Sequence, residues 1–509
     1  MVPILKAEQI KEVDRYTIEN KPIASIDLME DAATACVSWI VDNYNTQNVF
    51  HIVCGMGNNG GDGLAIARLL INKKYKVYVY IVKMSETGSK DFETNLKKLK
   101  NLSVAPKYFN EDSDIKIECC ENSVIIDAIF GSGLTRPVEN WMSKVVHSIN
   151  RIKRPVISID IPSGLFADTS TIELSKNIIC ATHTISLELP KLAFMMPENE
   201  SFTGYLHIVS IGLLKEYIFK LPAENFFITG GTLKNMLKPR KKFSHKGKFG
   251  HTLIIAGSTG KMGASILTGY GCLRSGTGLL TMHTPANYIN IIHSSLPEAM
   301  VSVDEDQECI SACPDLSPYN SIGVGPGIGI NKKTQKFLKL LIQNYRKPIV
   351  FDADALNILT ENKTWLAYVS EGSILTPHPG EFDRLFGKTK NNFQRLELQK
   401  EYSLKYQIFI VLKGAHTCIT TPSGHAYFNS TGNPGMATGG SGDVLTGIIT
   451  GLLSQGYSSL VSSLLGVYLH GLAGDIACDN LSEESLIASD IIAYLPEAFK
   501  KCNYSEANG

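Results

Sequence analysis

The chain has 509 residues, more than one ordinary hydrophobic core accommodates, and its length predicts two or three domains. Hydrophobic residues make up 44% and charged residues 19%, which is typical of a globular protein and excludes a disordered or fibrous one. The 49 basic and 49 acidic residues cancel, which argues against binding nucleic acid or an anionic membrane through net charge.

The eleven cysteines form no C-x-x-C pair, so their spacing does not indicate a zinc knuckle. Reduced thiols in a reducing compartment explain them most simply. The first twenty residues carry charge in every turn and contain no apolar signal core. No apolar run reaches the roughly 18 residues that a membrane helix needs. We therefore expect a cytoplasmic protein.

The first predicted elements are helical, because apolar residues recur at helical spacing from about residue 6 to residue 43. Beyond them, strand-like runs alternate with helical segments. These runs are "NVFHIVC", "YKVYVYIV", "SVIIDAIF", "PVISIDIP" and "HTISLEL". Apolar strands that alternate with helices predict a doubly wound parallel α/β sheet. Ligands bind such sheets beyond the carboxyl ends of the strands.

A glycine-rich turn, residues 57–63, follows the first of these strands. Its backbone N–H groups and the helix that it opens could bind a phosphate. Glycine is also needed for the geometry of a tight turn alone, so the pattern by itself is weak. Asn58, Asn59 and Asp62 favour a binding site, because polar side chains on such a turn need partners or a ligand.

Two aspartates end neighbouring predicted strands, Asp127 in "SVIIDAIF" and Asp160 in "VISIDIPSG". Each could simply cap the helix that follows. Together with Asn59 and Ser163 they also form a set of hard oxygen donors. Such donors suit an alkali or alkaline-earth cation better than zinc.

Periodicity breaks down over residues 213–239, and six Lys and Arg residues follow between Lys238 and Lys248. A run of this kind is typical of a solvated linker. The alternation restarts at "HTLIIAGS" with different motifs, which predicts a second α/β domain and not a duplication. We place the domains at residues 1–218 and 225–505.

The segment "TGNPGMATGGSGDVLTG" is the sharpest pattern in the second domain. Residues 439–442 would open a helix whose first N–H groups attract an anion. Asp443, in the first turn, could be only a favourable partner of the helix dipole. Beside an anion site it could also deprotonate a hydroxyl group.

Three further segments carry candidate ligand-binding residues. Lys413 in "LKGAHT" could contact a phosphate, although most lysines are only solvated. His378 lies between two prolines, a stiff setting that suits either a structural role or contact with a substrate. The glycines of "GVGPGIG", from Gly323, would let the backbone approach a ligand.

The motifs "GMGNNGGDG", "DAIFGSGLTRPV", "DIPSG" and "LELPKLAF" resemble the epimerase domain of the NAD(P)H-hydrate repair enzymes, over about residues 1–215. The resemblance implies a Rossmann-like domain that interconverts the R and S forms of hydrated NADH or NADPH. It implies potassium ligands at Asn59, Asp127 and Ser163. It implies substrate contacts at Asn58, Asn59, Gly60, Gly61, Asp62, Gly131, Ser132, Gly133, Leu134, Thr135, Arg136, Pro137 and Asp160.

Inverting a carbon that bears a hydroxyl group requires a group that takes and returns a proton. A carboxylate with a perturbed pKa in a partly closed cleft suits this role. Asp160 is therefore the catalytic candidate of the first domain.

The motifs "SHKGKFGHTLIIAGS", "GPGIG", "DADALNIL", "TPHPGE", "KGAHT" and "GGSGDVLTG" resemble the ribokinase-like superfamily and, within it, the NAD(P)H-hydrate dehydratase domain. The match covers about residues 225–505. It implies that a nucleotide phosphate, from ADP or ATP, drives loss of water from the S hydrate, with magnesium beside the phosphates. It implies Asp443 as the base. It implies nucleotide contacts at Lys413, Gly414, Ala415, His416, Thr417 and Gly442, and substrate contacts at Ala264, Gly327, His378 and Asp443.

The two resemblances together predict a bifunctional isomerase and hydro-lyase. We expect NADHX, NADPHX and ADP as ligands, no nucleic-acid or membrane partner, and a homo-oligomer. Two alternatives stay open. The second domain could be a kinase of a small alcohol or vitamin precursor, using Asp443 in the same way, and the first could be a binding module only.

Overall fold

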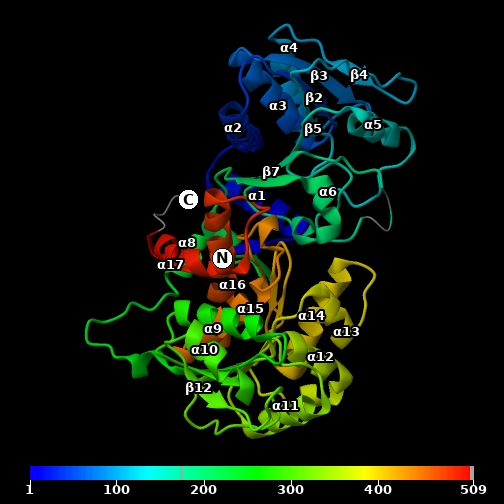
Figure 1. Ribbon diagram of the computed structural model, residues 1–509. Helices are drawn as coiled ribbons and strands as arrows, with labels where there is room; N and C mark the ends of the chain where they lie inside the picture. Colours follow the sequence, from blue (N-terminus) through cyan, green and yellow to red (C-terminus); the bar gives the residue numbers. More distant parts are fainter. Residues whose placement is uncertain (172–173, 175, 505–509) are drawn as a thin grey trace. The chain divides into compact units, whose positions relative to one another are not determined.

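The computed structural model describes residues 1–171, 174 and 176–504, so the last residue of the predicted range 225–505 lies outside the described residues. The chain forms two compact units (Figure 1). The N-terminal unit comprises Pro3–Ala223 and Asn391–Phe393. The C-terminal unit comprises Glu224–Lys390, Gln394–Gly509 and the first two residues.

The N-terminal unit contains a seven-stranded sheet in the order β4-β3-β2-β5-β6-β7-β8, in which every pairing is parallel. Its strands are β2 (Val49–Cys54), β3 (Lys76–Val82), β4 (Lys107–Phe109), β5 (Ser123–Ala128), β6 (Val156–Ile159), β7 (His183–Leu187) and β8 (Tyr205–Val209). β5 is buried at every position, as expected for a strand covered on both faces. The predicted parallel α/β sheet is confirmed.

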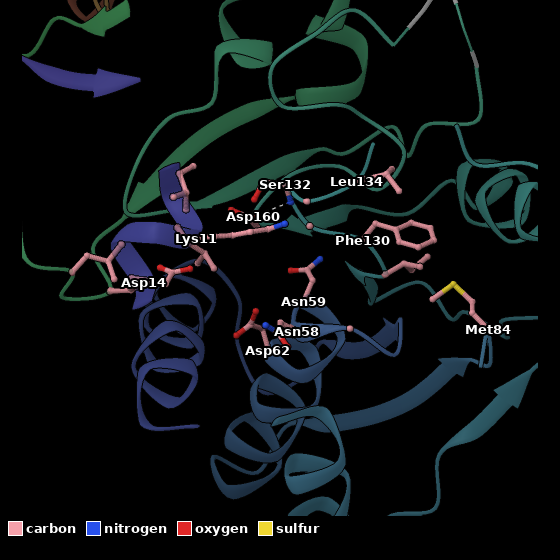
Figure 2. Close-up of a pocket in the computed structure, with 18 residues that line it drawn as sticks. Lys11, Asp14, Asn58, Asn59, Asp62, Met84, Phe130, Ser132, Leu134 and Asp160 are labelled. Carbon is pink, nitrogen blue, oxygen red and sulfur yellow. Dashed lines mark hydrogen bonds between the residues drawn. The ribbon is translucent and has the colours of Figure 1, made fainter. Parts of the chain in front are cut away.

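The strand order reverses between β2 and β5, because the chain moves outward to β4 and then returns to the other side of β2. Such a switch point leaves a crevice at the carboxyl edge of the sheet. The loops that follow β2 and β5 face each other there (Figure 2).

The helices of this unit are α1 (Ala7–Asn20), α2 (Ser25–Asn43), α3 (Asn58–Asn72), α4 (Lys90–Lys100), α5 (Asn140–Arg151), α6 (Glu200–Thr203) and α7 (Lys215–Ile218), with the 3₁₀ turns η1 (Leu192–Met195) and η2 (Pro197–Asn199). The helical region predicted over residues 6–43 is two helices, α1 and α2. Pro22 separates them, because proline lacks an N–H group and disfavours helical geometry at the residue before it.

The C-terminal unit contains an eleven-stranded sheet, apart from the last two residues of its edge strand β1, in the order β1-β9-β18-β17-β16-β15-β14-β13-β10-β11-β12. Its strands are β1 (Val2–Ile4), β9 (Asn225–Phe227), β10 (His251–Ile255), β11 (Leu279–Thr284), β12 (Met300–Val303), β13 (Ser321–Val324), β14 (Ile349–Phe351), β15 (Ile374–Leu375), β16 (Phe409–Leu412), β17 (Cys418–Thr420) and β18 (Ala426–Phe428). The seven strands from β10 to β16 are parallel, and β17 pairs antiparallel with both of its neighbours. Here the strand order reverses between β10 and β13.

The helices of this unit are α8 (Gly230–Lys234), α9 (Met262–Arg274), α10 (Ile289–Ser295), α11 (Lys332–Asn344), α12 (Ala353–Glu361), α13 (Pro379–Phe386), α14 (Asn392–Tyr406), α15 (Ser441–Ser454), α16 (Ser459–Asn480) and α17 (Ala488–Tyr504), with 3₁₀ turns η3 (Lys246–Phe249), η4 (Ala286–Tyr288), η5 (Lys363–Tyr368) and η6 (Pro434–Met436).

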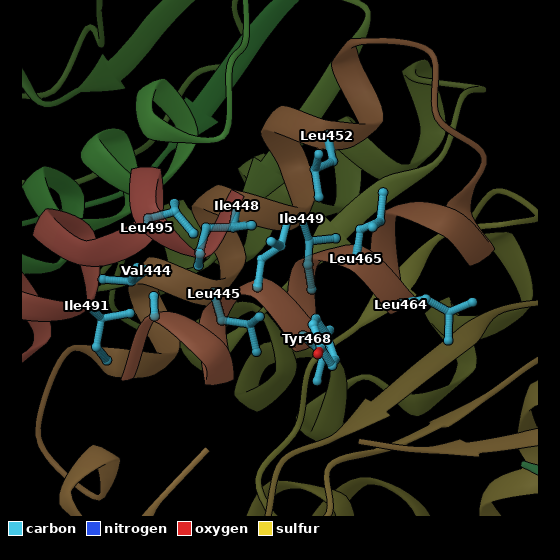
Figure 3. Packing of buried hydrophobic residues seen from close by; sticks show 14 of the residues in the cluster. Val444, Leu445, Ile448, Ile449, Leu452, Leu464, Leu465, Tyr468, Ile491 and Leu495 are labelled. Atoms are coloured by element: carbon cyan, nitrogen blue, oxygen red, sulfur yellow. The ribbon is translucent and has the colours of Figure 1, made fainter. Parts of the chain in front are cut away.

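The largest hydrophobic cluster of the C-terminal unit lies where α15, α16 and α17 pack together (Figure 3). Ile448 from α15, Leu464 from α16 and Leu495 from α17 are completely buried in it. By length and composition α16 could span a membrane, but 72% of its apolar window is buried inside the protein. Packing in this core therefore accounts for the apolar character of α16.

Candidate active sites

The first site is a cavity of about 450 Å³ at the switch point of the N-terminal sheet (Figure 2). Most of the predicted substrate contacts line it. They are Asn58, Asn59, Asp62, Gly131, Ser132, Gly133, Leu134 and Asp160. The glycine turn, the loop after β5 and the end of β6 therefore meet in one hollow, as the parallel sheet predicted.

Five of the predicted contacts do not line this cavity. Thr135 and Arg136 are exposed beyond it, and Pro137 follows them. Gly60 and Gly61 belong to the first turn of α3, where a Cβ atom on Gly60 would overlap the carbonyl oxygen of Gly55. Both glycines let α3 pack closely in its place and do not face the ligand space.

Asp160 is held at the end of β6 with a φ angle of 67°, a backbone conformation that is strained for any residue other than glycine. The backbone N–H of Ser132 donates to its carboxylate at 3.0 Å, and the Lys191 ammonium forms an ion pair with it. Burial alone would raise the pKa of Asp160, but Lys191 and these hydrogen bonds lower it below its ordinary value. Asp160 is therefore an ionised carboxylate, able to accept a proton.

Two further carboxyl groups line the cavity, and their pKa values move in the opposite direction. Burial raises the pKa of Asp62 well above its ordinary value, and the charge of Asp160 adds to this effect. Burial and Asp160 raise the pKa of Asp14 to about 6, while Lys191 opposes them. The cavity thus combines a carboxylate that stays ionised with two carboxyl groups that hold protons more firmly.

The predicted cation ligands lie around the segment that follows β5. Neither the Oδ1 nor the Nδ2 atom of buried Asn59 has a hydrogen-bond partner within the described part of the chain. Asn59 packs against Gly131, since a Cβ atom there would lie 3.4 Å from that of Asn59. The backbone N–H of Phe130 donates to the Ser163 hydroxyl at 2.9 Å, and that hydroxyl donates to Asp127 at 2.6 Å.

Asp127 is completely buried, and burial raises its pKa despite hydrogen bonds from Ser158 and Ser163. A buried carboxyl group and an amide oxygen that lacks a partner among the described residues are the hard oxygen donors that such a cation would need, although only Asn59 of the three predicted ligands lines the cavity. Within residues 1–171, 174 and 176–504, no group of three His, Cys, Asp or Glu side chains is placed to hold a metal ion.

Sequence reasoning missed two charged residues that line this cavity, Lys11 and Asp14, and also Lys191, which pairs with Asp160. Lys191 follows the predicted strand "HTISLEL", so its position at the carboxyl edge of the sheet was a usable signal. Lys11 and Asp14 come from α1, which carries no glycine turn or strand-end motif. Only the tertiary packing of α1 brings them to the cavity.

The residues of the second site lie along the carboxyl edge of the C-terminal sheet, from β10 at the switch point to β16, where neighbouring loops are joined by hydrogen bonds. The backbone N–H of Gly257 donates to the carbonyl of Pro326 at 2.8 Å. The N–H of Lys413 donates to the carbonyl of Pro377 at 2.9 Å. These bonds join the loop after β10 to that after β13, and the loop after β15 to that after β16, along the rim of the sheet.

Lys413 occupies the centre of a charged cluster on this rim. Its Nζ lies 2.8 Å from Oδ1 of Asp352 and 3.9 Å from a carboxylate oxygen of Glu381. Burial alone would lower the pKa of Lys413, but these two carboxylates raise it above its ordinary value. A Cβ atom on Gly442 would lie 3.4 Å from the same Nζ, so the ammonium group stands beside the first turn of α15.

Asp443 lies in that first turn, after Gly440, whose φ of 95° opens the helix. Burial raises the pKa of Asp443 to about 7, Asp352 and Asp354 contribute to the rise, and Lys413 opposes it. A carboxyl group that titrates near neutral pH beside the N–H groups of a helix start can act as a general base.

Ala264 and Gly327 are neighbours, because a Cβ atom on Gly327 would lie 3.3 Å from that of Ala264. Gly327 has a φ of 66°, and the Ser258 hydroxyl donates to its carbonyl at 2.7 Å. The two residues that the sequence placed in one substrate site thus share one wall of the rim.

His378 is the N-cap of α13: its Nδ1 accepts a hydrogen bond from the N–H of Gly380 at 3.0 Å. The stiff loop therefore has a structural explanation. Because Nδ1 is the acceptor, the neutral ring carries its proton on Nε2, which lies 3.6 Å from a carboxylate oxygen of Glu381.

The "KGAHT" segment forms the turn between β16 and β17. The Thr417 hydroxyl donates to the carbonyl of Gly414 at 3.0 Å, and Nδ1 of His416 donates to the carbonyl of Asn429 at 2.8 Å. These bonds fix a compact turn in which Gly414 and Ala415 are small enough for a ligand to approach.

Two residues that the sequence did not single out also support this site. Asp352 holds Lys413, and Nε2 of His470 donates to the carbonyl of Ser441 at 2.9 Å.

Comparison with known proteins finds two families along the chain. Residues 25–193 match the family described as YjeF-related protein N-terminus, and residues 252–497 match the family described as NAD(P)H-hydrate dehydratase. The chain is 34% identical to the bifunctional NAD(P)H-hydrate repair enzyme Nnr of Moorella thermoacetica, over 97% of this chain and 96% of the relative. It is 30% identical to the enzyme of the same name from Escherichia coli, over 99% and 96%.

Among solved structures, the chain is similar to the ADP/ATP-dependent NAD(P)H-hydrate dehydratase of Bacillus subtilis, co-crystallised with ATP and Mg²⁺. The identity is 33% and the TM-score 0.47, over 54% of this chain and 98% of that chain. It is also similar to a ribokinase-like superfamily protein of Enterococcus faecalis, with 30% identity and a TM-score of 0.49, over 55% and 98%.

Proposed function

Because the chain belongs to the family of bifunctional NAD(P)H-hydrate repair enzymes, we infer that it restores hydrated NADH and NADPH to their intact forms. The N-terminal unit interconverts the R and S hydrates, and the C-terminal unit removes water from the S hydrate. Hydration produces both epimers and the second reaction uses only the S epimer, so the first reaction converts the R epimer into it. One observation carries this inference: relatives match the chain over nearly its whole length, and therefore over both units.

In the epimerase site, the N–H groups at the start of α3 bind the pyrophosphate of the hydrate. Asn58 and Asp62 line the same cavity and contact the nucleotide. Asp160, kept ionised by Lys191, takes the proton of the hydroxyl group at the carbon that inverts.

A potassium ion would be held by the amide oxygen of Asn59, the carboxylate of Asp127 and the hydroxyl oxygen of Ser163. Two observations support this ligand set: the Asn59 amide has no hydrogen-bond partner among the residues that the structure describes, and Asp127 is a buried carboxyl group. The ion would supply positive charge beside the phosphates of the substrate. Asn59 thereby links the glycine turn to the cation site.

In the dehydratase site, Asp443 takes the proton of the substrate hydroxyl as its oxygen attacks the terminal phosphorus of ADP, and AMP leaves. The phosphate ester then departs with its bonding electrons, and loss of a proton from the neighbouring carbon restores the double bond of NADH or NADPH. Lys413 and the first N–H groups of α15 stabilise the charge on the transferred phosphate. Magnesium bound with the nucleotide would neutralise the charge of its phosphate oxygens.

The test is to incubate the full chain with a mixture of R and S hydrates of NADH and ADP, and to follow absorbance at the reduced-nicotinamide band. The proposal predicts recovery of the whole mixture, with one AMP and one phosphate released for each NADH. If NADH is recovered only from the S fraction, and the R hydrate converts no faster than it does spontaneously, the epimerase function is contradicted and the first unit is a binding module. If no band returns and a phosphorylated small alcohol forms from other substrates, the second unit is a kinase.

A further inference from the structure

Helix α1 supplies two charged side chains to the epimerase cavity, Lys11 and Asp14 (Figure 2). Both precede residue 25, where the match to the family of the N-terminal unit begins. The cavity therefore includes a wall that the family match does not cover, and that wall carries a carboxyl group.

The charged groups that face Asp14 are Asp160, Lys191 and Asp62, besides Lys11 on its own helix. Burial and the charge of Asp160 raise the pKa of Asp14 to about 6, against the effect of Lys191. Asp160, in contrast, is ionised by its ion pair with Lys191. The pKa values of two carboxyl groups in one cavity are thus shifted in opposite directions. Acid–base catalysis uses such a pair, one group as acid and the other as base.

The chemistry of the hydrate requires two proton-transfer groups. Water adds to an enamine at the carbon bonded to nitrogen, so the hydrated carbon carries both the hydroxyl group and the ring nitrogen. That carbon inverts without oxidation if its bond to nitrogen opens and closes again on the other face. Opening needs a base for the hydroxyl proton and an acid for the nitrogen.

We propose that Asp14 is the acid of the epimerase site and acts together with Asp160 as the base, an inference that rests on the proposed epimerase function. Asp160 takes the hydroxyl proton, the electrons of the O–H bond form a C=O bond, and the C–N bond breaks. The nitrogen then takes the proton of Asp14. After rotation about the neighbouring C–C bond, the nitrogen attacks the other face of the carbonyl carbon, returns its proton to Asp14, and the oxygen recovers its proton from Asp160. Both carboxyl groups end as they began.

Asp62 is the competing candidate for the acid. It is 8% exposed and lies in the first turn of α3, among the groups that hold the nucleotide. Asp14 is only partly buried, so it exchanges protons with solvent more readily between turnovers. A pKa of about 6 also lies closer to neutral pH than that of an ordinary carboxyl group, which suits a general acid.

The decisive variant is Asp14→Asn in the full chain, with Glu19→Gln as its matched control. Glu19 lies on the same helix, is exposed, and is outside the cavity. We expect kcat for R-to-S conversion to fall about 100-fold in Asp14→Asn, the usual contribution of a general acid, and to stay at the wild-type value in Glu19→Gln. Because protonated Asp14 is the active form, wild-type kcat/KM falls as pH rises through about 6, and Asp14→Asn loses this fall.

The outcomes separate the inference from the function on which it rests. If the wild-type chain does not interconvert the epimers, the proposed epimerase function fails. If the wild type is active and Asp14→Asn matches Glu19→Gln, or loses rate while keeping the fall above pH 6, the role of Asp14 as acid is overturned. The dehydratase rate and the thermal unfolding midpoint of each variant show whether that variant is folded. Should Asp14→Asn unfold, Asp14→Glu serves instead. The inference requires kcat/KM of Asp14→Glu to fall as pH rises, as in the wild type, and a profile without this fall contradicts it.

Discussion

The residue that most directly links structure to chemistry in the C-terminal unit is Asp443. Its pKa of about 7 depends on burial and on the charge of Asp352, which also holds Lys413. The dehydratase needs the ionised form of Asp443 as base. Its kcat/KM is therefore expected to rise as pH increases through about 7.

Replacing Asp352 tests this electrostatic origin. Asp352→Asn removes a negative charge that adds to the raised pKa of Asp443 and leaves Lys413 with Glu381 and Asp443 as its remaining carboxyl neighbours. We expect the midpoint of the kcat/KM profile to move below the wild-type value of about 7, with a lower plateau because Lys413 loses its anchor. The measurement is the dehydratase rate on the S hydrate across pH 5 to 9, with the exposed-acid variant Asp315→Asn as control. A midpoint that stays in place contradicts the account.

The cation site gives a prediction that does not depend on activity. Potassium is expected to raise the thermal unfolding temperature of the full chain above that in choline at equal ionic strength, because only the folded state holds the ligand set. At a concentration one hundred times the Kd the gain is about 2.7 kcal/mol.

Asn59→Ala is expected to lose this difference between the salts, and the exposed Asn43→Ala to keep it. A potassium effect of the same size in Asn59→Ala would remove Asn59 from the ligand set.

The sequence could predict site residues at or shortly beyond the carboxyl ends of strands in a parallel sheet. Asp127, Asp160 and Ser163 are of this kind, and the structure groups them at one edge. It could not predict Asp14, which depends on the packing of α1. Nor could it show that His378 caps α13, because capping depends on where that helix begins.

At the scale of elements, the start of α3 shows why the glycine turn is so dense. Only some of its glycines face the ligand: Gly57 lines the cavity, whereas Gly60 packs against the backbone of Gly55. The motif therefore combines binding and packing, which sequence alone could not separate.

Two glycine substitutions distinguish these roles. Gly60→Ala is expected to lower the free energy of unfolding of the N-terminal unit by about 1–3 kcal/mol, because its Cβ would overlap a backbone carbonyl that cannot move aside. Gly57→Ala, where nothing lies within 4 Å of the added atom and φ is −88°, is expected to leave stability almost unchanged. Urea unfolding followed by circular dichroism measures both. Equal stability of the two variants would contradict the packing role of Gly60.

At the scale of the whole molecule, the alternation of apolar strands and helices predicted two α/β units and the edges at which their sites lie. The strand orders were not predictable, because they depend on pairings between segments far apart in the chain. The reversals between β2 and β5 and between β10 and β13 arise from such pairings. Each reversal lies inside its sheet, away from both edge strands.

The central claim is that the chain carries two separate active sites, one in each unit. The most direct measurement is to assay both reactions on the full-length Asp160→Asn and Asp443→Asn variants, with purified R and S hydrates. We predict that Asp160→Asn loses about 10²–10⁴-fold in epimerisation and keeps the wild-type dehydratase rate, and that Asp443→Asn shows the reverse. Loss of both reactions in either folded variant, or of neither, would contradict the account.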